Sequence, residues 1–246
     1  MFKKELDRRR LGGYYLNMFK SDAAPKTTKK SQRTAQKILA AALDLFRTKG
    51  FDQATMRDVA AAAGVAIGAA YYYYPSKDAI VLAFYERACA EMRPRIEAAL
   101  ETARGALDDR LEALVRAKLE YFAPYRGVLR ALLKNGADPA HPLSPFAENN
   151  KAIRDVDIAT FGRALEMSGV RVPKDLAPHM PGVLWMFQMG VIFFWITDDS
   201  EGQRRTTKLL ALGVKIVSTL LKIAGLPLTR PLRRVVVELI ETVESA

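Results

Sequence analysis

Cysteine and histidine are scarce in this sequence. The single cysteine, Cys89, excludes a disulfide framework within the chain and is typical of a reducing cytosol. The two histidines, His141 and His179, lie near prolines and lack the spacing of metal ligands, so we interpret both as surface residues and predict no metal site. We expect Cys89 to be a buried structural residue rather than a nucleophile paired with a histidine.

The sequence also lacks the motifs of the common catalytic sites. It has no glycine-rich phosphate loop, no Gly-x-Ser-x-Gly sequence and no paired carboxylates at a recognised spacing. We therefore predict that the protein is not an enzyme and binds no cofactor.

No hydrophobic run reaches the roughly 20 residues that a helix needs to cross a bilayer. The nearest candidate, residues 182–197, lies between Pro181 and Asp198 and carries Gln188 near its middle, so we interpret it as a buried helix. Residues 1–20 are basic, but acids interrupt them and they lack the apolar stretch of a signal peptide. We expect a cytoplasmic protein with no membrane partner.

Acidic residues are outnumbered, with 27 Asp and Glu against 38 Lys and Arg, which gives a net charge of +11 and a pI near 9.8. Such a balance favours a polyanion or an anionic membrane as the partner. Nine basic residues lie in residues 1–32, a polar segment that we interpret as a flexible basic arm. The alternative is an unstructured extension or a misplaced start codon.

The alternation of apolar and polar residues that marks β-strands is missing, and helical periodicity takes its place. From Arg33 to Gly50 an apolar stripe predicts a first helix, with Ile38, Leu39, Ala42, Leu45 and Phe46 on one face. Thr55, with Asp58 three residues later, predicts the start of a second helix, which ends at Gly64.

A third helix begins almost at once, at Ala66, and ends before Pro75. Two short helices joined so tightly through a glycine indicate a helix-turn-helix unit. Ser76 caps a fourth, longer helix, and breaks follow at Pro94, Gly105, Pro124, residues 136–145, Pro173, Pro181 and residues 225–227. The pattern predicts an all-α protein in which a helix-turn-helix domain, residues 33–84, is linked by the fourth helix to a larger helical domain, residues 85–246.

Four motifs occur in order within residues 33–85. They are the apolar-Phe-x-x-x-Gly end of the first helix, the Thr-x-x-x-Val-Ala start of the second, the Ala-Gly-Val turn, and a closing Gly-x-x-Tyr-Tyr-x-aromatic-x-Ser-Lys. Together they resemble the DNA-binding domain of the tetracycline-repressor (TetR) family of transcriptional regulators. The resemblance is close over about a fifth of the chain, and the remaining helices fit the family's ligand-binding and dimerisation domain in a general way.

The resemblance implies a homodimer on an inverted-repeat operator in double-stranded DNA, with the third helices of the two subunits in the major groove roughly 34–36 Å apart. It also implies that the last two large helices form a four-helix bundle with the second subunit. A small-molecule effector in the larger domain would tilt the fourth helix and release the DNA. We therefore expect a ligand-responsive repressor, with an activator as one alternative and a basic helical protein that binds a membrane surface or a partner protein as the other.

The third helix has few groups that read bases. Ala66, Ile67, Gly68 and Ala69 offer no hydrogen bond to a base edge, although they permit a close approach and Ile67 can touch thymine methyl groups. Arg57, on the first turn of the second helix, is the leading candidate for a hydrogen bond to a base. The alternative is a surface cation paired with an acid.

Phosphate contacts are expected from Thr55 and Lys77, which lie at helix N-termini where exposed amides favour an anion. In the run of four tyrosines, the resemblance places Tyr74 inside as a buried aromatic residue. It leaves three on the edge that faces DNA, namely Tyr71, Tyr72 and Tyr73, the last at a position usually held by histidine.

Aromatic residues and methionines surround the helix expected at residues 182–197, and we assign most of them to the core and the dimer interface. A subset, with the aromatic residues around Pro124, is expected to line a pocket for a small apolar effector with Gln188 as its polar anchor. The predicted pocket residues are Tyr121, Phe122, Tyr125, Trp185, Gln188 and Met189.

Overall fold

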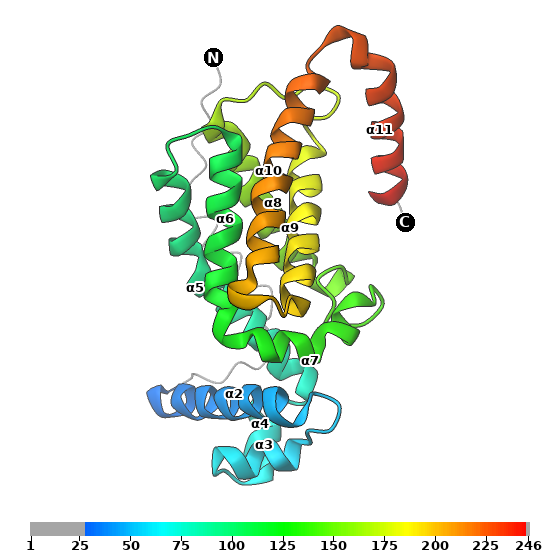
Figure 1. Cartoon of the computed structure of the whole chain (residues 1–246). Helices are drawn as coiled ribbons and strands as arrows, with labels where there is room; N and C mark the ends of the chain where they lie inside the picture. The colour runs from blue at the N-terminus through cyan, green and yellow to red at the C-terminus, as the bar shows by residue number, and fades with distance from the viewer. Residues whose placement is uncertain (1–27, 245–246) are drawn as a thin grey trace.

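A computed structural model describes residues 28–244 of the chain. Every regular element in this part is a helix, and the helices form a small N-terminal unit below a larger bundle (Figure 1). The small unit contains α2 (Lys29–Lys49), α3 (Met56–Ala63) and α4 (Ile67–Tyr73). The all-α prediction is confirmed.

α2 begins four residues before the predicted start at Arg33. The Thr28 hydroxyl caps the helix by accepting a hydrogen bond from the Ser31 amide at 3.3 Å. Residues 29–32, which we expected in the flexible arm, therefore belong to this helix. The rest of that arm, residues 1–27, lies outside the described residues.

The start and the end of α3 are built as the sequence predicts. Thr55 and Asp58 form a full capping box, in which the Thr55 hydroxyl accepts from the Asp58 amide at 3.1 Å and the Asp58 carboxylate accepts from the Thr55 amide at 2.9 Å. Gly64 then ends the helix in the left-handed region, at φ +60°, where a side chain would be strained. The tight turn packs α4 against α3, with Ala63 and Ala70 buried.

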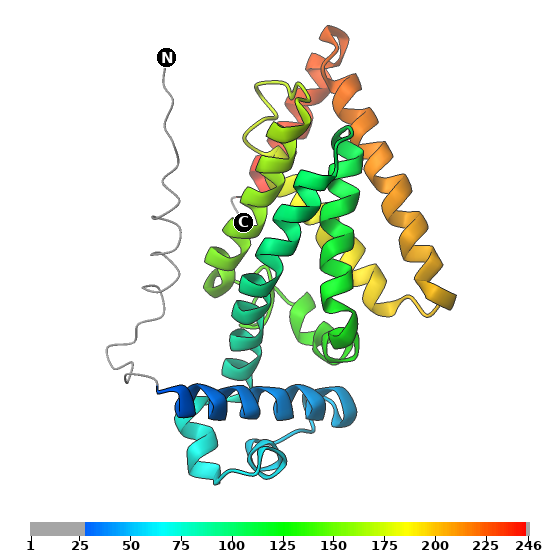
Figure 2. The same ribbon diagram turned by 90° about the vertical axis from the view of Figure 1, so that its left-hand side faces the viewer.

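α5 (Lys77–Thr102) connects the small unit to the larger bundle, where it runs alongside α6 (Leu107–Phe122) (Figure 2). Ser76 caps α5 as predicted, since its hydroxyl accepts from the Ala79 amide at 3.1 Å. One continuous helix therefore belongs to both units.

The expected break at Pro94 is wrong, because α5 continues through this residue. A proline removes one amide donor from a helix and crowds the preceding turn. Met92 and Ile96, on either side of Pro94, are buried in the core of the larger bundle and hold the helix in place. Tertiary packing thus overrides the local signal.

The larger bundle contains the remaining helices and short 3-10 turns. In order they are η1 (Ala123–Tyr125), α7 (Arg126–Ala137), η2 (Glu148–Asn150), α8 (Lys151–Ser168), α9 (Met180–Thr197), η3 (Glu201–Gln203), α10 (Arg204–Ala224), η4 (Pro227–Thr229) and α11 (Arg230–Glu244).

α9 is the helix that we expected from residues 182–197. It packs against α7, α8 and α10, and eight of its residues are buried, among them Trp185, Gln188 and Met189. By length and composition alone α9 is apolar enough to cross a membrane, and half of that window is buried inside the protein. Its apolar side chains thus contribute to the core of the bundle.

Aromatic side chains join the two units. The Phe84 ring, on α5, lies 6.3 Å from the Phe122 ring and 4.9 Å from the Tyr125 ring, centroid to centroid. Phe122 and Tyr125 pack against the cores of both units. The Arg87 guanidinium also donates a hydrogen bond to the Tyr125 hydroxyl at 3.0 Å. The junction is therefore packed and mainly apolar.

Candidate functional site

One face of α4 is exposed and nearly free of hydrogen-bonding groups. Ile67 is 43 % exposed, and the neighbouring Ala66 and Gly68 are exposed as well. A Cβ atom added at Gly68 would meet nothing within 4 Å, so the protein's own packing does not require a glycine there. Ala69 is half-buried and the next residue, Ala70, is fully buried against the core. The face is therefore smooth and open to a close partner.

The four tyrosines divide into an exposed pair and a half-buried pair. Tyr71 and Tyr72 are 50 % and 67 % exposed. Tyr74 packs inward as predicted, its hydroxyl donates to the Ala35 carbonyl at 3.3 Å, and burial raises the pKa of its phenol. Tyr73, which we expected on the exposed edge, also packs against the core of the small unit, with its ring edge-on to Tyr72. Two phenols, rather than three, face outward.

Arg57 is exposed on the first turn of α3. It forms no hydrogen bond or ion pair with any of residues 28–244. The pairing with an acid that we gave as the alternative is therefore not formed within the described part of the chain. The guanidinium is therefore exposed with its donors available to another molecule.

Thr55 already has partners within the small unit. Its hydroxyl donates to the Asp58 carboxylate at 2.9 Å, and the same carboxylate binds the Lys49 ammonium at 2.7 Å. The hydrogen bond from Lys49, followed by those from Thr55, lowers the pKa of Asp58 to about 2. The N-terminus of α3 is thus held by a Lys–Asp–Thr cluster on the protein surface.

Lys77, the second residue expected at phosphates, closes the loop that follows α2. Its ammonium donates to the Phe51 carbonyl at 2.6 Å and to the Asp52 carbonyl at 3.3 Å, and it lies 4.6 Å from the centre of the Phe51 ring. The side chain therefore ties the start of α5 to the loop between α2 and α3.

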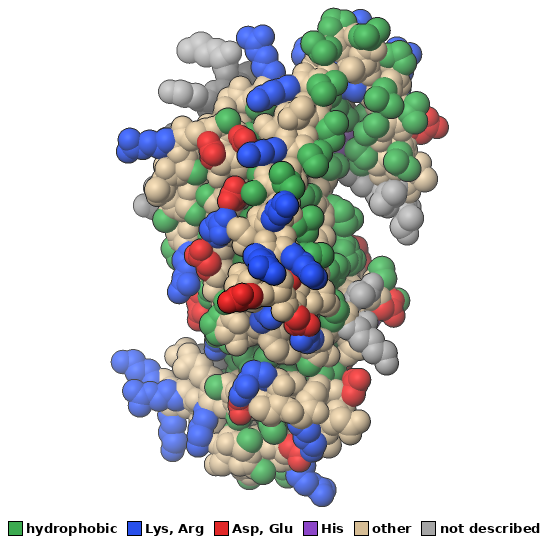
Figure 3. Space-filling model, viewed as in Figure 1, with side chains coloured by type: hydrophobic (Ala, Val, Ile, Leu, Met, Phe, Trp, Pro, Cys, Tyr) green, Lys and Arg blue, Asp and Glu red, His purple; other side chains and the backbone are tan. Residues whose placement is uncertain are grey.

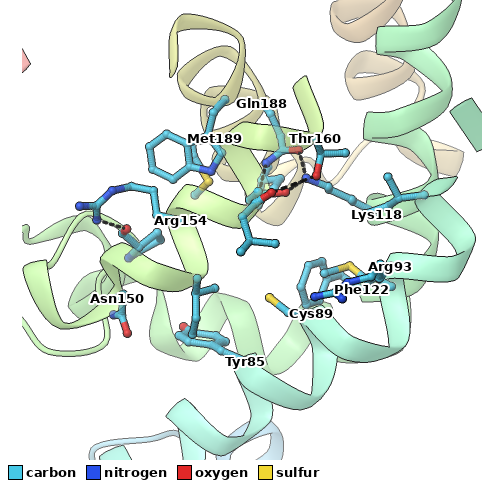
Figure 4. Close-up of a pocket in the computed structure, with 18 of the residues that line it drawn as sticks. Tyr85, Cys89, Arg93, Lys118, Phe122, Asn150, Arg154, Thr160, Gln188 and Met189 are labelled. Carbon is cyan, nitrogen blue, oxygen red and sulfur yellow. Dashed lines mark hydrogen bonds and ion pairs between the residues drawn. The ribbon is translucent and has the colours of Figure 1, made fainter. Parts of the chain in front are cut away.

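The larger bundle encloses a cavity of about 380 Å³ between α5, α6, α7, α8 and α9 (Figure 4). Four of the six predicted pocket residues line it, namely Phe122, Trp185, Gln188 and Met189. Tyr121 and Tyr125 do not. Tyr121 is buried with its hydroxyl donating to Glu91 at 2.7 Å, and Tyr125 lies in the junction between the units.

A buried polar network forms part of the cavity wall. The Lys118 ammonium, 2 % exposed, donates to the Asp157 carboxylate and to the Gln188 carbonyl oxygen, and the Gln188 amide donates to Asp157 at 3.0 Å (Figure 4). Gln188 was predicted as a polar anchor, whereas sequence reasoning missed Lys118 and Asp157. A signal existed, because Lys118 falls on the apolar stripe of α6 formed by Leu111, Leu114, Val115 and Tyr121.

α5 supplies a further wall that the sequence reasoning missed. Tyr85, Cys89, Met92 and Ile96 line the cavity at helical spacing. Tyr85 and Cys89 lie one residue beyond Phe84 and Ala88, which face the core. Burial raises the pKa of Tyr85 to about 12 and that of the Cys89 thiol to about 11. Both groups are neutral near pH 7, so this wall carries no charge from either residue.

Comparison with known families matches both parts of the chain. Residues 38–84 match the family described as bacterial regulatory proteins, tetR family. Residues 110–239 match the family described as tetracyclin repressor-like, C-terminal domain.

Solved structures of similar fold cover most of the chain. A bacterial regulatory protein in the tetR family from Rhodococcus RHA1 shares 23% identity over 75% of this chain and 97% of its own, with a TM-score of 0.54. The TetR transcriptional regulator from Nitrosomonas europaea shares 20% identity over 75% and 97%, with a TM-score of 0.55. The fatty acid degradation regulator FadR from Bacillus halodurans shares 20% identity over 79% and 96%, with a TM-score of 0.57.

Proposed function

This chain belongs to the TetR family of transcriptional regulators, and from that premise we propose that it is a cytoplasmic, ligand-responsive repressor of specific genes. Members of the family are non-enzymatic transcription factors that bind operator DNA, act as dimers and bind small-molecule effectors. We further propose how it reads its operator, how it releases the DNA and which kind of effector it binds.

In this proposal α4 enters the major groove with its smooth face toward the bases. Gly68 lets the helix backbone approach closely, Ile67 contacts thymine methyl groups, and Arg57 supplies the hydrogen bonds to a base that α4 itself lacks. The exposed phenols of Tyr71 and Tyr72 reach phosphates. The other predicted contacts, Thr55, Tyr73 and Lys77, act mainly by positioning, because each is engaged within the small unit.

The observation that carries the proposed switch is that α5 serves both units. Lys77 at its start is fixed to the loop before α3, and Tyr85, Cys89, Met92 and Ile96 further along line the cavity. A molecule that fills the cavity displaces this wall and shifts the helix that carries the small unit. The two α4 helices of a dimer then lose the roughly 34–36 Å separation that fits one turn of DNA, and the operator is released.

The cavity favours a mainly apolar effector. Aliphatic and aromatic side chains make up most of the wall, and its Lys118, Asp157 and Gln188 side chains are hydrogen-bonded to one another. The Bacillus halodurans protein of similar fold is named for fatty acid degradation. We infer that an acyl chain or a molecule of similar character fits here.

The dimer face that we infer lies on α9 and α10. Each helix has a stripe of exposed apolar side chains at helical spacing. These residues are Val183, Met186 and Phe194 on α9, and Leu209, Leu212, Ile216, Leu220 and Ile223 on α10.

DNA binding is tested by fluorescence anisotropy with the DNA upstream of the protein's own gene and with a scrambled duplex. We expect a specific complex, and a panel of fatty acids and other apolar molecules should include one that dissociates it. Arg57→Ala should weaken specific binding by about 1–3 kcal/mol and relax the preference at one base pair. The control is Arg116→Ala, on the exposed side of α6, which should leave binding unchanged.

Two results would contradict the proposal. Weak, salt-sensitive binding that ignores sequence would exclude a specific regulator. Uniform weakening of all duplexes by Arg57→Ala would show that Arg57 contacts a phosphate rather than a base.

A further inference from the structure

α11 presents an apolar stripe that its own chain does not cover. Leu232 and Leu239 are 65 % and 64 % exposed, and Val235 and Val236 lie between them on the same side of the helix. The opposite side faces the bundle, where Val237 packs against the core. The inner face of α11 thus packs against the bundle, and its outer apolar face has no partner among residues 28–244.

Arg233 fixes the orientation of α11. Its guanidinium donates to the Asp175 carboxylate at 2.9 Å and to the Ala224 carbonyl at 2.5 Å, and its side chain is only 14 % exposed. The ion pair lowers the pKa of Asp175. Turning the outer stripe inward would break both interactions, so the stripe stays exposed in the single subunit.

The stripe continues the apolar surface of α9 and α10. Of the seventeen large hydrophobic side chains exposed in the described residues, fourteen lie on α9, α10, α11 and the turn between α10 and α11. The chain bends by 96° at that turn, and from there α10 and α11 run apart (Figure 2). Figure 3 shows hydrophobic side chains along both helices on this face of the molecule. A surface of this extent is unusual for a monomer.

We propose that α11 is a clasp for a second copy of this chain, so that the partner subunit packs on the outer stripe of α11 as well as on α9 and α10. The proposal rests on the dimer face on α9 and α10 inferred above, which the outer stripe of α11 extends. Interfaces of permanent homodimers bury roughly 2,000–5,000 Å² and are more apolar than the rest of the surface. The clasp enlarges the apolar contact of each subunit by one helix.

The charges of α11 favour a protein partner over a membrane. The helix carries three arginines and three glutamates, Arg230, Arg233, Arg234, Glu238, Glu241 and Glu244, and so has no net charge. A helix that lies on an anionic membrane has a polar face rich in lysine and arginine. Balanced charges beside an apolar stripe fit the rim of a symmetric protein interface.

The test compares three variants of the full-length protein by analytical ultracentrifugation over a range of concentrations. Leu232→Glu/Leu239→Glu disrupts the stripe and lowers the net charge by two, and Arg234→Glu makes the same charge change on the exposed polar side of α11. Ile216→Glu disrupts the α10 face. We expect the first variant to raise the dimer Kd at least tenfold, the second to leave it within twofold, and the third to abolish the dimer.

Two further measurements distinguish a second subunit from a membrane as the occupant of the stripe. Amide hydrogen exchange of residues 230–244 in the wild type should slow as the dimer forms, which tests the clasp without any substitution. Co-sedimentation with phosphatidylglycerol vesicles tests whether a membrane covers the stripe instead.

The proposal is overturned if Leu232→Glu/Leu239→Glu dimerises like the wild type, or if amide exchange in α11 is independent of dimerisation. It is also overturned if vesicles capture the wild type but not this variant while the dimer is unaffected. A dimer that withstands Leu232→Glu/Leu239→Glu and fails with Ile216→Glu refutes only the clasp. A wild type that binds its operator and stays monomeric refutes the dimer face as well.

Discussion

Each unit of the molecule contains a cluster of a lysine, an aspartate and one neutral side chain. In the small unit Lys49, Asp58 and Thr55 meet at the surface, where the lysine and aspartate side chains are 45 % and 34 % exposed. In the larger bundle Lys118, Asp157 and Gln188 meet at the cavity, where the same two residue types are 2 % and 26 % exposed.

The same composition therefore has different consequences in the two places. Water competes for the surface cluster and screens its charges, so the ion pair itself contributes little and the main effect is the capping of α3. The buried cluster has lost most of its hydration, so each member depends on the others for its hydrogen bonds. The first holds a helix end locally, and the second joins α6, α8 and α9.

The largest effect is expected from Lys118→Met, which keeps the length of the side chain and removes its charge. Asp157 would lose its cation in a mostly buried site, so the free energy of unfolding should fall by about 3–5 kcal/mol. Urea unfolding followed by circular dichroism measures the change. The matched control is Lys49→Met in the surface cluster, and an equal loss in the two variants would contradict the comparison.

A smaller effect is expected at the surface cap. Thr55→Ala removes the side chain that accepts from the Asp58 amide and should lower the free energy of unfolding by about 1 kcal/mol. Thr55→Ser retains the hydroxyl and serves as the control in the same urea titrations. If both substitutions lower stability equally, the hydroxyl is not what holds the start of α3.

Gly68→Ala should separate stability from binding on the exposed face of α4. An alanine meets no atom of the protein within 4 Å and is a better helix former, so the free energy of unfolding should rise by about 0.5–1 kcal/mol. Operator binding should weaken, because the added methyl group keeps the helix from the groove. A Cβ atom added at Gly136, on α7, also meets nothing within 4 Å, and Gly136→Ala should leave the DNA affinity unchanged. Unchanged operator affinity for Gly68→Ala would argue against a close approach at this residue.

The smallest effect is expected in the pH dependence of the surface cluster. The pKa of Asp58 falls from 3.8 to about 2 on folding, so the unfolded chain binds more protons in that range. The contribution of Asp58 to the free energy of unfolding is fully present above about pH 4 and is lost as the pH falls toward 2. Asp58→Asn should melt at a lower temperature than the wild type at pH 5. The difference in melting temperature between the two proteins should be smaller at pH 2. A difference that is the same at both pH values would contradict this assignment.

The sequence predicts most of the small unit because its signals are local. The capping box joins Thr55 to Asp58, three residues away, and Gly64 and Ser76 mark the end of α3 and the start of α5. The family matches confirm the prediction of a TetR-type regulator and favour it over a basic helical protein of another class.

The cavity was predicted only in part, because its contacts are distant in sequence. Lys118 lies 39 residues from Asp157 and 70 from Gln188, and no local pattern joins them. The wall from α5 was missed because apolar residues lie on two adjacent stripes of that helix, and the sequence does not show which of them faces a cavity. Tyr121 and Tyr125 were placed in the pocket from their spacing around Pro124, which does not determine the direction in which each ring points.

The aromatic junction also determines how the chain unfolds. Phe122 and Tyr125 pack against the cores of both units, so neither core can lose its structure without exposing side chains that the other covers. Exposing apolar surface to water is unfavourable and raises the heat capacity. The two units are therefore expected to melt together in a single calorimetric transition, and an effector that stabilises the cavity raises the melting temperature of the DNA-binding helices as well.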